Sequence, residues 1–228
     1  MVAPLSRSGD SKEEHSAQFK LDEDGTLSGS VRMTWTGHLA VKRRAALFRK
    51  SAAEREEYIK DEMKDQFGSP EINDIKWDGI DDSERPVSVS FAMKATGYVQ
   101  KTGKRIFVQP AVFQRAFAAR FPNSTRVYPV YFQYAWSEVD DISIEVPAGY
   151  EFDHPDIPPS IKAGDTVDWK VTARIEGKTK LVYERRFSFG DDGNLVLPVT
   201  AYANVKKVFD AIHEGDDHTF ALKQAVAQ

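Results

Sequence analysis

The 228-residue sequence contains no cysteine, which excludes disulfides, thiolate metal sites, iron–sulfur clusters and cysteine nucleophiles within the chain. Positive charge is not in excess either, since 31 lysines and arginines stand against 35 aspartates and glutamates and the net charge is −4. The composition therefore gives no support for binding to nucleic acid or to acidic lipid. We expect no membrane span, because no stretch reaches the ~18 consecutive apolar residues that one needs.

Targeting and cofactor signals are also missing. Residues 1–7 lack the basic and then apolar order of a signal peptide. Two interpretations fit: a cytoplasmic protein, or the later part of a longer exported protein of the periplasm or cell envelope. Gly25, Gly29 and Gly37 do not have the spacing of a nucleotide-binding fingerprint. We expect no cofactor.

What is present is the composition of an ordinary globular protein, with 41% hydrophobic and 29% charged residues. The length allows one large domain or two modest ones. We predict three regions: a disordered lead or linker over residues 1–16, an α+β subdomain over 17–122, and a β-sandwich-like domain with a C-terminal helix over 123–228. The lead is polar and has no periodicity.

The first half predicts an antiparallel sheet with one packed helix. Leu27, Val31, Met33 and Trp35 alternate with polar residues, which is typical of a strand with one buried face. Apolar residues then recur at helical spacing from about residue 43 to 67, and Gly68 is expected to end that helix. Further short alternating stretches predict three more strands before residue 109.

The second half predicts short strands and one closing helix. Alternating stretches at 142–146, 167–175 and 181–189 indicate strands, and Trp35 and Trp169 lie on the apolar sides of theirs. Residues 198–213 form an amphipathic pattern that we expect to end at Gly215, before a final strand near residues 220–222. Residues 109–123 predict either a short helix or an ordered connector.

Four aromatic residues form the main candidate for a binding surface. Tyr128, Tyr131, Tyr134 and Trp136 fall within one strand-like segment and include both parities, so the strand would offer aromatic rings to both faces. One face would belong to the core. The other would serve as a platform for a sugar or a protein partner, unless the fold covers it as well.

Two polar clusters could carry chemistry. His213, Asp216, Asp217 and His218 supply imidazole and carboxylate ligands of the kind that bind metals, although a helix end at Gly215 would separate the two histidines. Glu138, Asp140 and Asp141 form the densest carboxylate group, and paired carboxylates can hydrolyse glycosides. A non-functional alternative also fits each cluster. The first would be a solvated helix end, and the second would be charged residues at the end of a strand.

Several segments carry a family resemblance. They are Leu21-Asp-Glu-Asp-Gly-Thr-Leu-Ser-Gly29, Arg126-Val-Tyr-Pro-Val-Tyr-Phe132, Val146-Pro-Ala-Gly-Tyr150 and Tyr202-Ala-Asn-Val-Lys-Lys-Val-Phe-Asp-Ala-Ile212. With them, residues 17–223 resemble the C-terminal region, a domain of unknown function, of bacterial transglutaminase-like envelope proteins. The catalytic Cys, His and Asp of that family belong to its central domain, and no residue here corresponds to them.

The resemblance implies a non-catalytic structural or interaction module that packs on, or presents substrate to, a catalytic domain. Its expected partner is an upstream transglutaminase-like domain or another envelope protein. Two alternatives stay open: a carbohydrate- or peptidoglycan-binding module that uses the aromatic strand, and a metal-assisted hydrolase that uses the His213 to His218 cluster.

Overall fold

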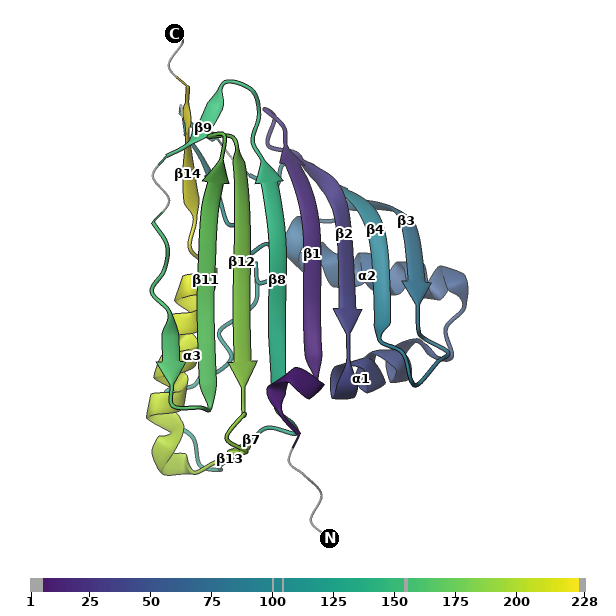
Figure 1. The fold of residues 1–228 in the computed structure, drawn as a ribbon, viewed down its shortest axis with the longest axis vertical. Coiled ribbons are helices and arrows are strands. Elements are labelled where there is room, and N and C mark those ends of the chain that lie inside the picture. The colour runs from purple at the N-terminus through teal and green to yellow at the C-terminus, as the bar shows by residue number, and fades with distance from the viewer. Residues whose placement is uncertain (1–5, 100, 104, 154–155, 226–228) are drawn as a thin grey trace.

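The computed structural model describes residues 6–99, 101–103, 105–153 and 156–225. Its main feature is an eight-stranded sheet in the order β10-β11-β12-β8-β1-β2-β4-β3 (Figure 1). The described residues also form two smaller sheets and three α-helices. The predicted α+β, mainly β class is therefore confirmed.

The strands of the large sheet are long at its centre and short at one edge. They are β1 Lys12–Leu21, β2 Leu27–Trp35, β3 Glu71–Asp78, β4 Val87–Ala95, β8 Trp136–Glu145, β10 Ile161–Ala163, β11 Val167–Glu176 and β12 Lys180–Phe189. The small sheets contain β5 Lys101–Thr102, β6 Arg105–Val108, β9 Tyr150–Phe152 and β14 Phe220–Gln224, and separately β7 Val130–Tyr131 with β13 Val196–Leu197. The α-helices are α1 Gly37–Leu47, α2 Ala52–Phe67 and α3 Tyr202–Asp216.

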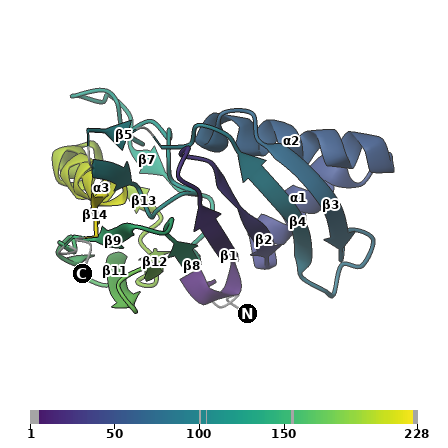
Figure 2. The ribbon, with the colours of Figure 1, turned by 90° about the horizontal axis from the view of Figure 1, so that it is seen from above.

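One face of the large sheet is covered and the other is open. Figure 2 shows α1 and α2 over β1 to β4, and α3 with the small sheets over β8, β11 and β12, all on the same side. The strand burial follows this layering, since residues of one parity are buried along β1, β2 and β12 while the other parity is exposed or half-buried. Trp35 and Trp169 lie in the core, as predicted.

The expected organisation of residues 1–16, 17–122 and 123–228 needs correction. Residues 12–16 are not a disordered lead, because they form the first half of β1. The boundary near residue 122 does not divide the sheet, because β1 pairs in parallel with β8 from the second half, with Ala17 opposite Ile142. This pairing joins segments more than 100 residues apart, so periodicity along the chain cannot reveal it.

The expected helix over 43–67 is two helices. Ser51 caps the start of α2: its side chain accepts from the backbone N–H of Glu54, and the Glu54 carboxylate accepts from the backbone N–H of Ser51. Such a capping box begins a new helix and turns the chain. Ala45, Phe48 and Ala52, which the helical spacing assigns to the apolar face, are consequently exposed. Gly68 ends α2 in the left-handed conformation, as predicted.

Two further details concern the C-terminal part. Gly215 does not end the last helix but lies inside α3, which continues to Asp216. The final strand is present as β14. Residues 109–123 form an ordered connector without helix or strand, and its Val112, Phe113 and Phe121 side chains are buried. Within the described ranges, no helix is both long enough and apolar enough to cross a membrane.

Candidate functional site

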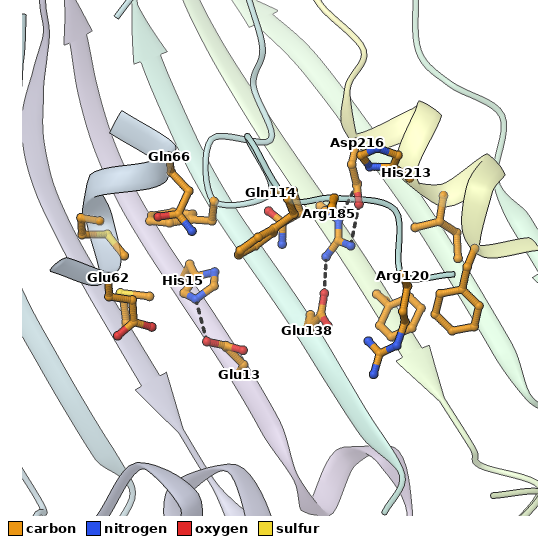
Figure 3. A pocket seen from close by; sticks show the side chains of 18 residues that line it. Glu13, His15, Glu62, Gln66, Gln114, Arg120, Glu138, Arg185, His213 and Asp216 are labelled. Carbon is orange, nitrogen blue, oxygen red and sulfur yellow. Dashed lines mark hydrogen bonds and ion pairs between the residues drawn. The ribbon is translucent and has the colours of Figure 1, made fainter. Parts of the chain in front are cut away.

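A cavity of about 340 Å³ lies on the covered face of the large sheet. Its floor is made by β1, β8 and β12, and its walls by the end of α2, the 109–123 connector and α3 (Figure 3). The described residues that line it include no serine, threonine or lysine. They combine two groups, the charged or amide side chains Glu13, His15, Glu62, Gln66, Gln114, Arg120, Glu138, Arg185, His213 and Asp216, and the apolar side chains Met33, Met63, Phe113, Phe117, Ala118, Phe187, Phe209 and Ile212.

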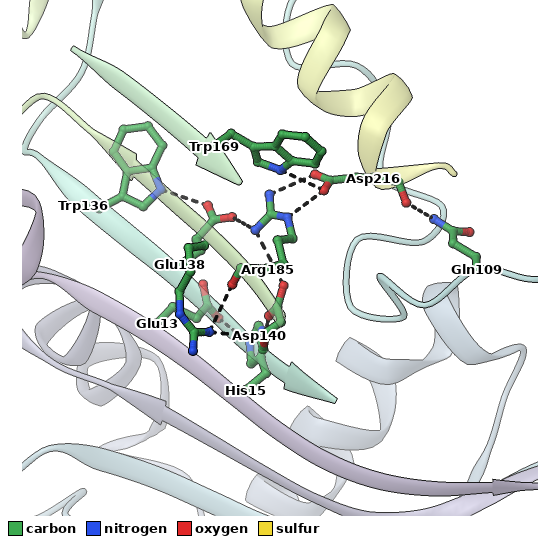
Figure 4. Close-up of polar contacts among 10 residues, drawn as sticks. Glu13, His15, Gln109, Trp136, Glu138, Asp140, Trp169, Arg185 and Asp216 are labelled. Atoms are coloured by element: carbon green, nitrogen blue, oxygen red, sulfur yellow. Dashed lines mark hydrogen bonds and ion pairs between the residues drawn. The ribbon is translucent and has the colours of Figure 1, made fainter. Parts of the chain in front are cut away.

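Three charged side chains lie in one row across the floor. His15 of β1 is in register with Asp140 of β8, which is in turn in register with Arg185 of β12. His15 Nδ1 is 2.7 Å from Asp140 Oδ1, and Arg185 Nη1 is 3.6 Å from Asp140 Oδ2. All three side chains are buried (Figure 4). Because register neighbours on one face of a sheet contact each other, the strand pairing itself brings these charges together.

Arg185 is held by carboxylates from two directions. Its Nε and Nη2 atoms donate to the two carboxylate oxygens of Asp216 at the end of α3, at 2.6 and 2.8 Å. Its Nη1 atom donates to Glu138 at 2.9 Å. Trp169 donates from its indole nitrogen to Asp216 at 3.1 Å. The carboxylates outweigh burial and raise the pKa of Arg185 further above its usual value, so it stays charged.

A second group surrounds Glu13, two residues before His15 on the same face of β1. Glu13 Oε1 accepts from the indole nitrogen of Trp35 at 2.6 Å and lies 3.2 Å from His15 Nε2. Burial disfavours charge on the imidazole, but hydrogen bonds to Asp140 and Glu13 outweigh it and raise the pKa of His15 to about 10. Burial also opposes ionisation of Glu13, yet contacts with His15 and Trp35 lower its pKa to about 2. Both groups are therefore charged at neutral pH.

Arg120 differs from these groups because no carboxylate of the described residues lies within ion-pair distance of it. Its guanidinium stacks over the rings of Trp136 and Phe132 at 4.8 and 5.3 Å from their centroids. The side chain is exposed at the rim of the cavity. Its N–H groups are thus available as donors, while the aromatic rings hold it in place.

Two glutamines complete the polar lining. Gln66 comes from the last turn of α2 and Gln114 from the connector, and Figure 3 shows both directed toward the space between the helices. They are only 6% and 9% exposed, and the side-chain oxygen of each has no hydrogen-bond partner. A buried oxygen without a partner costs folding free energy, so neither glutamine is explained by the fold alone.

The four predicted aromatic residues do not form one platform. Tyr128 and Tyr131 are 76% and 67% exposed, but Trp136 is 7% exposed and donates from its indole to Glu138. Tyr134 is half-buried and stacks on His38 with 4.7 Å between ring centroids. The segment from residue 126 to 135 is mostly irregular, with only β7 extended. Strand parity therefore does not apply across it, and Trp136 cannot stack on a sugar.

The two exposed tyrosines belong instead to an apolar patch at one end of the large sheet. Tyr131 is paired in register with Val196 in the β7–β13 ribbon, and both side chains are exposed. Figure 1 shows this ribbon at the lower end of the molecule. We define the β7–β13 patch as the exposed apolar side chains of its two segments, Val127, Tyr128, Tyr131, Val196 and Val199.

The predicted metal cluster is divided by the fold. Asp216 points inward to Arg185, whereas Asp217 is exposed and lies 3.6 Å from His213 Nε2. His218 contacts the ring of Phe220. Among the described residues, no group of three or more histidine or carboxylate side chains is arranged to hold a metal ion. The carboxylate group is divided too, since Asp140 is buried on the inner face and Asp141 pairs with Arg186 on the outer face.

Sequence reasoning missed the buried network, although the sequence holds a signal for it. Arg185 shares the parity of Tyr183 and Phe187, and Asp140 shares that of Ile142 and Ile144. A charged residue in phase with the apolar face of a strand must be buried with a partner. His15 has the same relation to the apolar residues of β1, but its assignment to a disordered lead concealed it. Nothing local marks Asp216 as the partner of Arg185.

Comparison with known proteins gives one match. The protein-family model described as "Domain of Unknown Function with solved-structure structure (DUF3858)" matches residues 104–222. A search of curated proteins and a search of solved structures returned no significant match. The matched segment is more than half of the 228 residues and includes most of the cavity walls as well as the β7–β13 patch. The chain belongs to the DUF3858 family.

Proposed function

We propose that this chain is a non-catalytic interaction module that docks on a catalytic domain through the β7–β13 patch. The observation that carries the proposal is the pairing of Tyr131 with Val196 on an exposed ribbon. Tyrosine and aliphatic side chains that are exposed side by side are typical of protein interfaces. An aromatic anchor of this kind often carries a large share of the binding free energy.

The arrangement of the cavity also supports a non-catalytic role. Its acidic side chains already accept hydrogen bonds from protein groups: Glu13 from Trp35, Glu138 from Trp136 and Arg185, and Glu62 from Arg43. A general acid or base must exchange a proton with a substrate. These pairs join neighbouring strands, in the case of Glu13 and Glu138, or the helices α1 and α2, in the case of Glu62.

The partner we propose is an upstream transglutaminase-like domain, and the alternative is another envelope protein. Support comes from the resemblance of residues 17–223 to the C-terminal region of such proteins. The DUF3858 match over residues 104–222 supports a domain of unknown function and is compatible with a non-catalytic module. In this proposal the module packs on the catalytic domain or presents substrate to it.

The proposal is tested by isothermal titration of the 228-residue chain with a separately purified transglutaminase-like domain. We expect saturable binding by the wild-type chain and at least tenfold weaker binding by the double variant Tyr131→Ser/Val196→Ser. Phe48→Ser is the matched control, because Phe48 is equally exposed but lies after α1, outside the patch. It should bind like the wild type. No binding by the wild type, or equal binding by the double variant, would contradict the proposal.

A further inference from the structure

The cavity between α2, the connector and α3 has features that the docking proposal does not use. It shares no residue with the β7–β13 patch. The charged groups of the floor network are paired with one another, and Asp140 Oδ2, which accepts no hydrogen bond, still lies 3.6 Å from Arg185 Nη1. The side-chain oxygens of Gln66 and Gln114 have no such counter-charge, and no described residue pairs with Arg120. Gln66 comes from α2, whereas Gln114 and Arg120 come from the 109–123 connector, and all three side chains line one cavity (Figure 3).

The two glutamines indicate the chemistry of a ligand. A carboxamide offers both a donor and an acceptor, and a half turn of its terminal bond exchanges their positions. The group that matches it best is another amide, which offers the same pair in reverse. An apolar side chain of similar size at either position would remove a buried oxygen without a partner, at no cost to the fold.

The charges and the apolar walls of the cavity further restrict the kind of ligand that fits it. Four lining carboxylates face three cationic side chains, so the cavity is close to neutral and offers no strong attraction to an ion of either sign. Phe113, Phe209 and Ile212 supply apolar walls, and Phe117 is exposed beside them. The volume is at the lower limit for small-molecule sites of ~300–1,000 Å³. It suits one side chain with its flanking peptide groups.

We propose that this cavity binds an uncharged, apolar segment of extended peptide. The Arg120 guanidinium donates to a peptide carbonyl at the rim, and the carboxamides of Gln66 and Gln114 pair with peptide N–H and C=O groups inside. The apolar side chain of the segment contacts Phe117 and Phe209.

The test uses the full chain, labelled with nitrogen-15, and the neutral peptide N-acetyl-Ala-Leu-Ala-amide as the probe. We expect saturable shifts of the Arg120 Nε–H signal and of the side-chain amide signals of Gln66 and Gln114. Glucose and N-acetylleucine are titrated in the same way. Shifts with glucose alone would show that the cavity binds carbohydrate. If N-acetylleucine, which carries a carboxylate, bound at least tenfold more tightly than the neutral peptide, the cavity would be an anion site. Either result, or no shift with the peptide, overturns the proposal.

Variants separate a binding role from a structural one. Gln66→Leu and Gln114→Leu should each weaken peptide binding at least fivefold while Tm stays unchanged or rises. Gln18→Leu, on the outer face of β1, is the matched control and should leave binding unchanged. Arg120→Gln should weaken binding by a similar factor, whereas Arg49→Gln, at an exposed position away from the cavity, should not. Unchanged binding by both leucine variants would overturn the proposal.

Discussion

Arg185 on β12 and Asp216 at the end of α3 form a bidentate ion pair between buried side chains. Arg185 Nε and Nη2 lie 2.6 and 2.8 Å from the two carboxylate oxygens of Asp216. Through it the last helix is fixed to the centre of the sheet. Because Arg185 also contacts Glu138 and Asp140 of β8, a single side chain connects three elements. The geometry of the cavity depends on this connection.

Removal of the Arg185 charge should destabilise the fold strongly. Arg185→Met leaves buried carboxylates without their cation, and we expect a loss of about 3–5 kcal/mol in the free energy of unfolding. Urea denaturation of both proteins measures this difference. Arg186→Met is the matched control, because Arg186 pairs with Asp141 on the exposed face and its loss should cost less than about 1 kcal/mol. Equal effects of the two substitutions would show that the buried network is not important for stability.

Stability should fall at alkaline pH because of His15. Its pKa is about 10 in the folded protein against 6.5 ordinarily, so the folded state binds the proton more tightly. The resulting stabilisation is complete below the ordinary pKa and is lost as the pH rises toward 10. Between about pH 6 and pH 9 we expect the wild type to lose on the order of 2–3 kcal/mol more than His15→Gln. Parallel pH profiles of the two proteins would mean that folding does not raise the pKa of His15.

Gly215→Ala should destabilise the protein although it lies in a helix. Alanine is favoured over glycine in helices by about 1 kcal/mol. A Cβ atom at this position, however, would lie 2.4 Å from Cη2 of the buried Trp169 side chain. We expect a net loss on the order of 1–3 kcal/mol, because α3 must move away from the sheet. Ala203→Gly, at an exposed site of α3, should show the ordinary helix penalty alone. Thermal melts compare the two, and a stabilised Gly215→Ala would exclude the close contact.

Trp169→Ala should cost about 3–5 kcal/mol, because it leaves a large cavity in the core. It also removes the indole donor to Asp216. Chemical denaturation gives the value directly. A loss below about 1 kcal/mol would mean that the buried face of β11 is assigned incorrectly.

The spacing of apolar residues was sufficient to predict those features of the fold that depend on a single segment of the chain. Alternation located the buried faces of β2 and β11, including Trp35 and Trp169, and helical spacing located α3. It failed where pairing is distant, as in the parallel contact of β1 with β8 that makes the two halves one sheet. It also failed where a side chain overrides the spacing, since the Ser51 cap divides the expected helix.

The candidate sites show the same limit. Tyr128 and Tyr131 could be identified as exposed aromatics, but the burial of Trp136 depends on its packing against Phe187 and Phe189 of the neighbouring strand β12. The cavity combines α2, the connector and α3, which are far apart in the sequence. No local pattern could bring Gln66 and Gln114 together.

Docking on a catalytic domain through the β7–β13 patch is tested most directly by amide hydrogen exchange of the 228-residue chain, alone and with a transglutaminase-like domain. We expect slower exchange in the complex at residues 127–131 and 195–199, with the open face of the large sheet unchanged. Unchanged exchange in those two segments, or protection confined to the open face of the sheet, would contradict it.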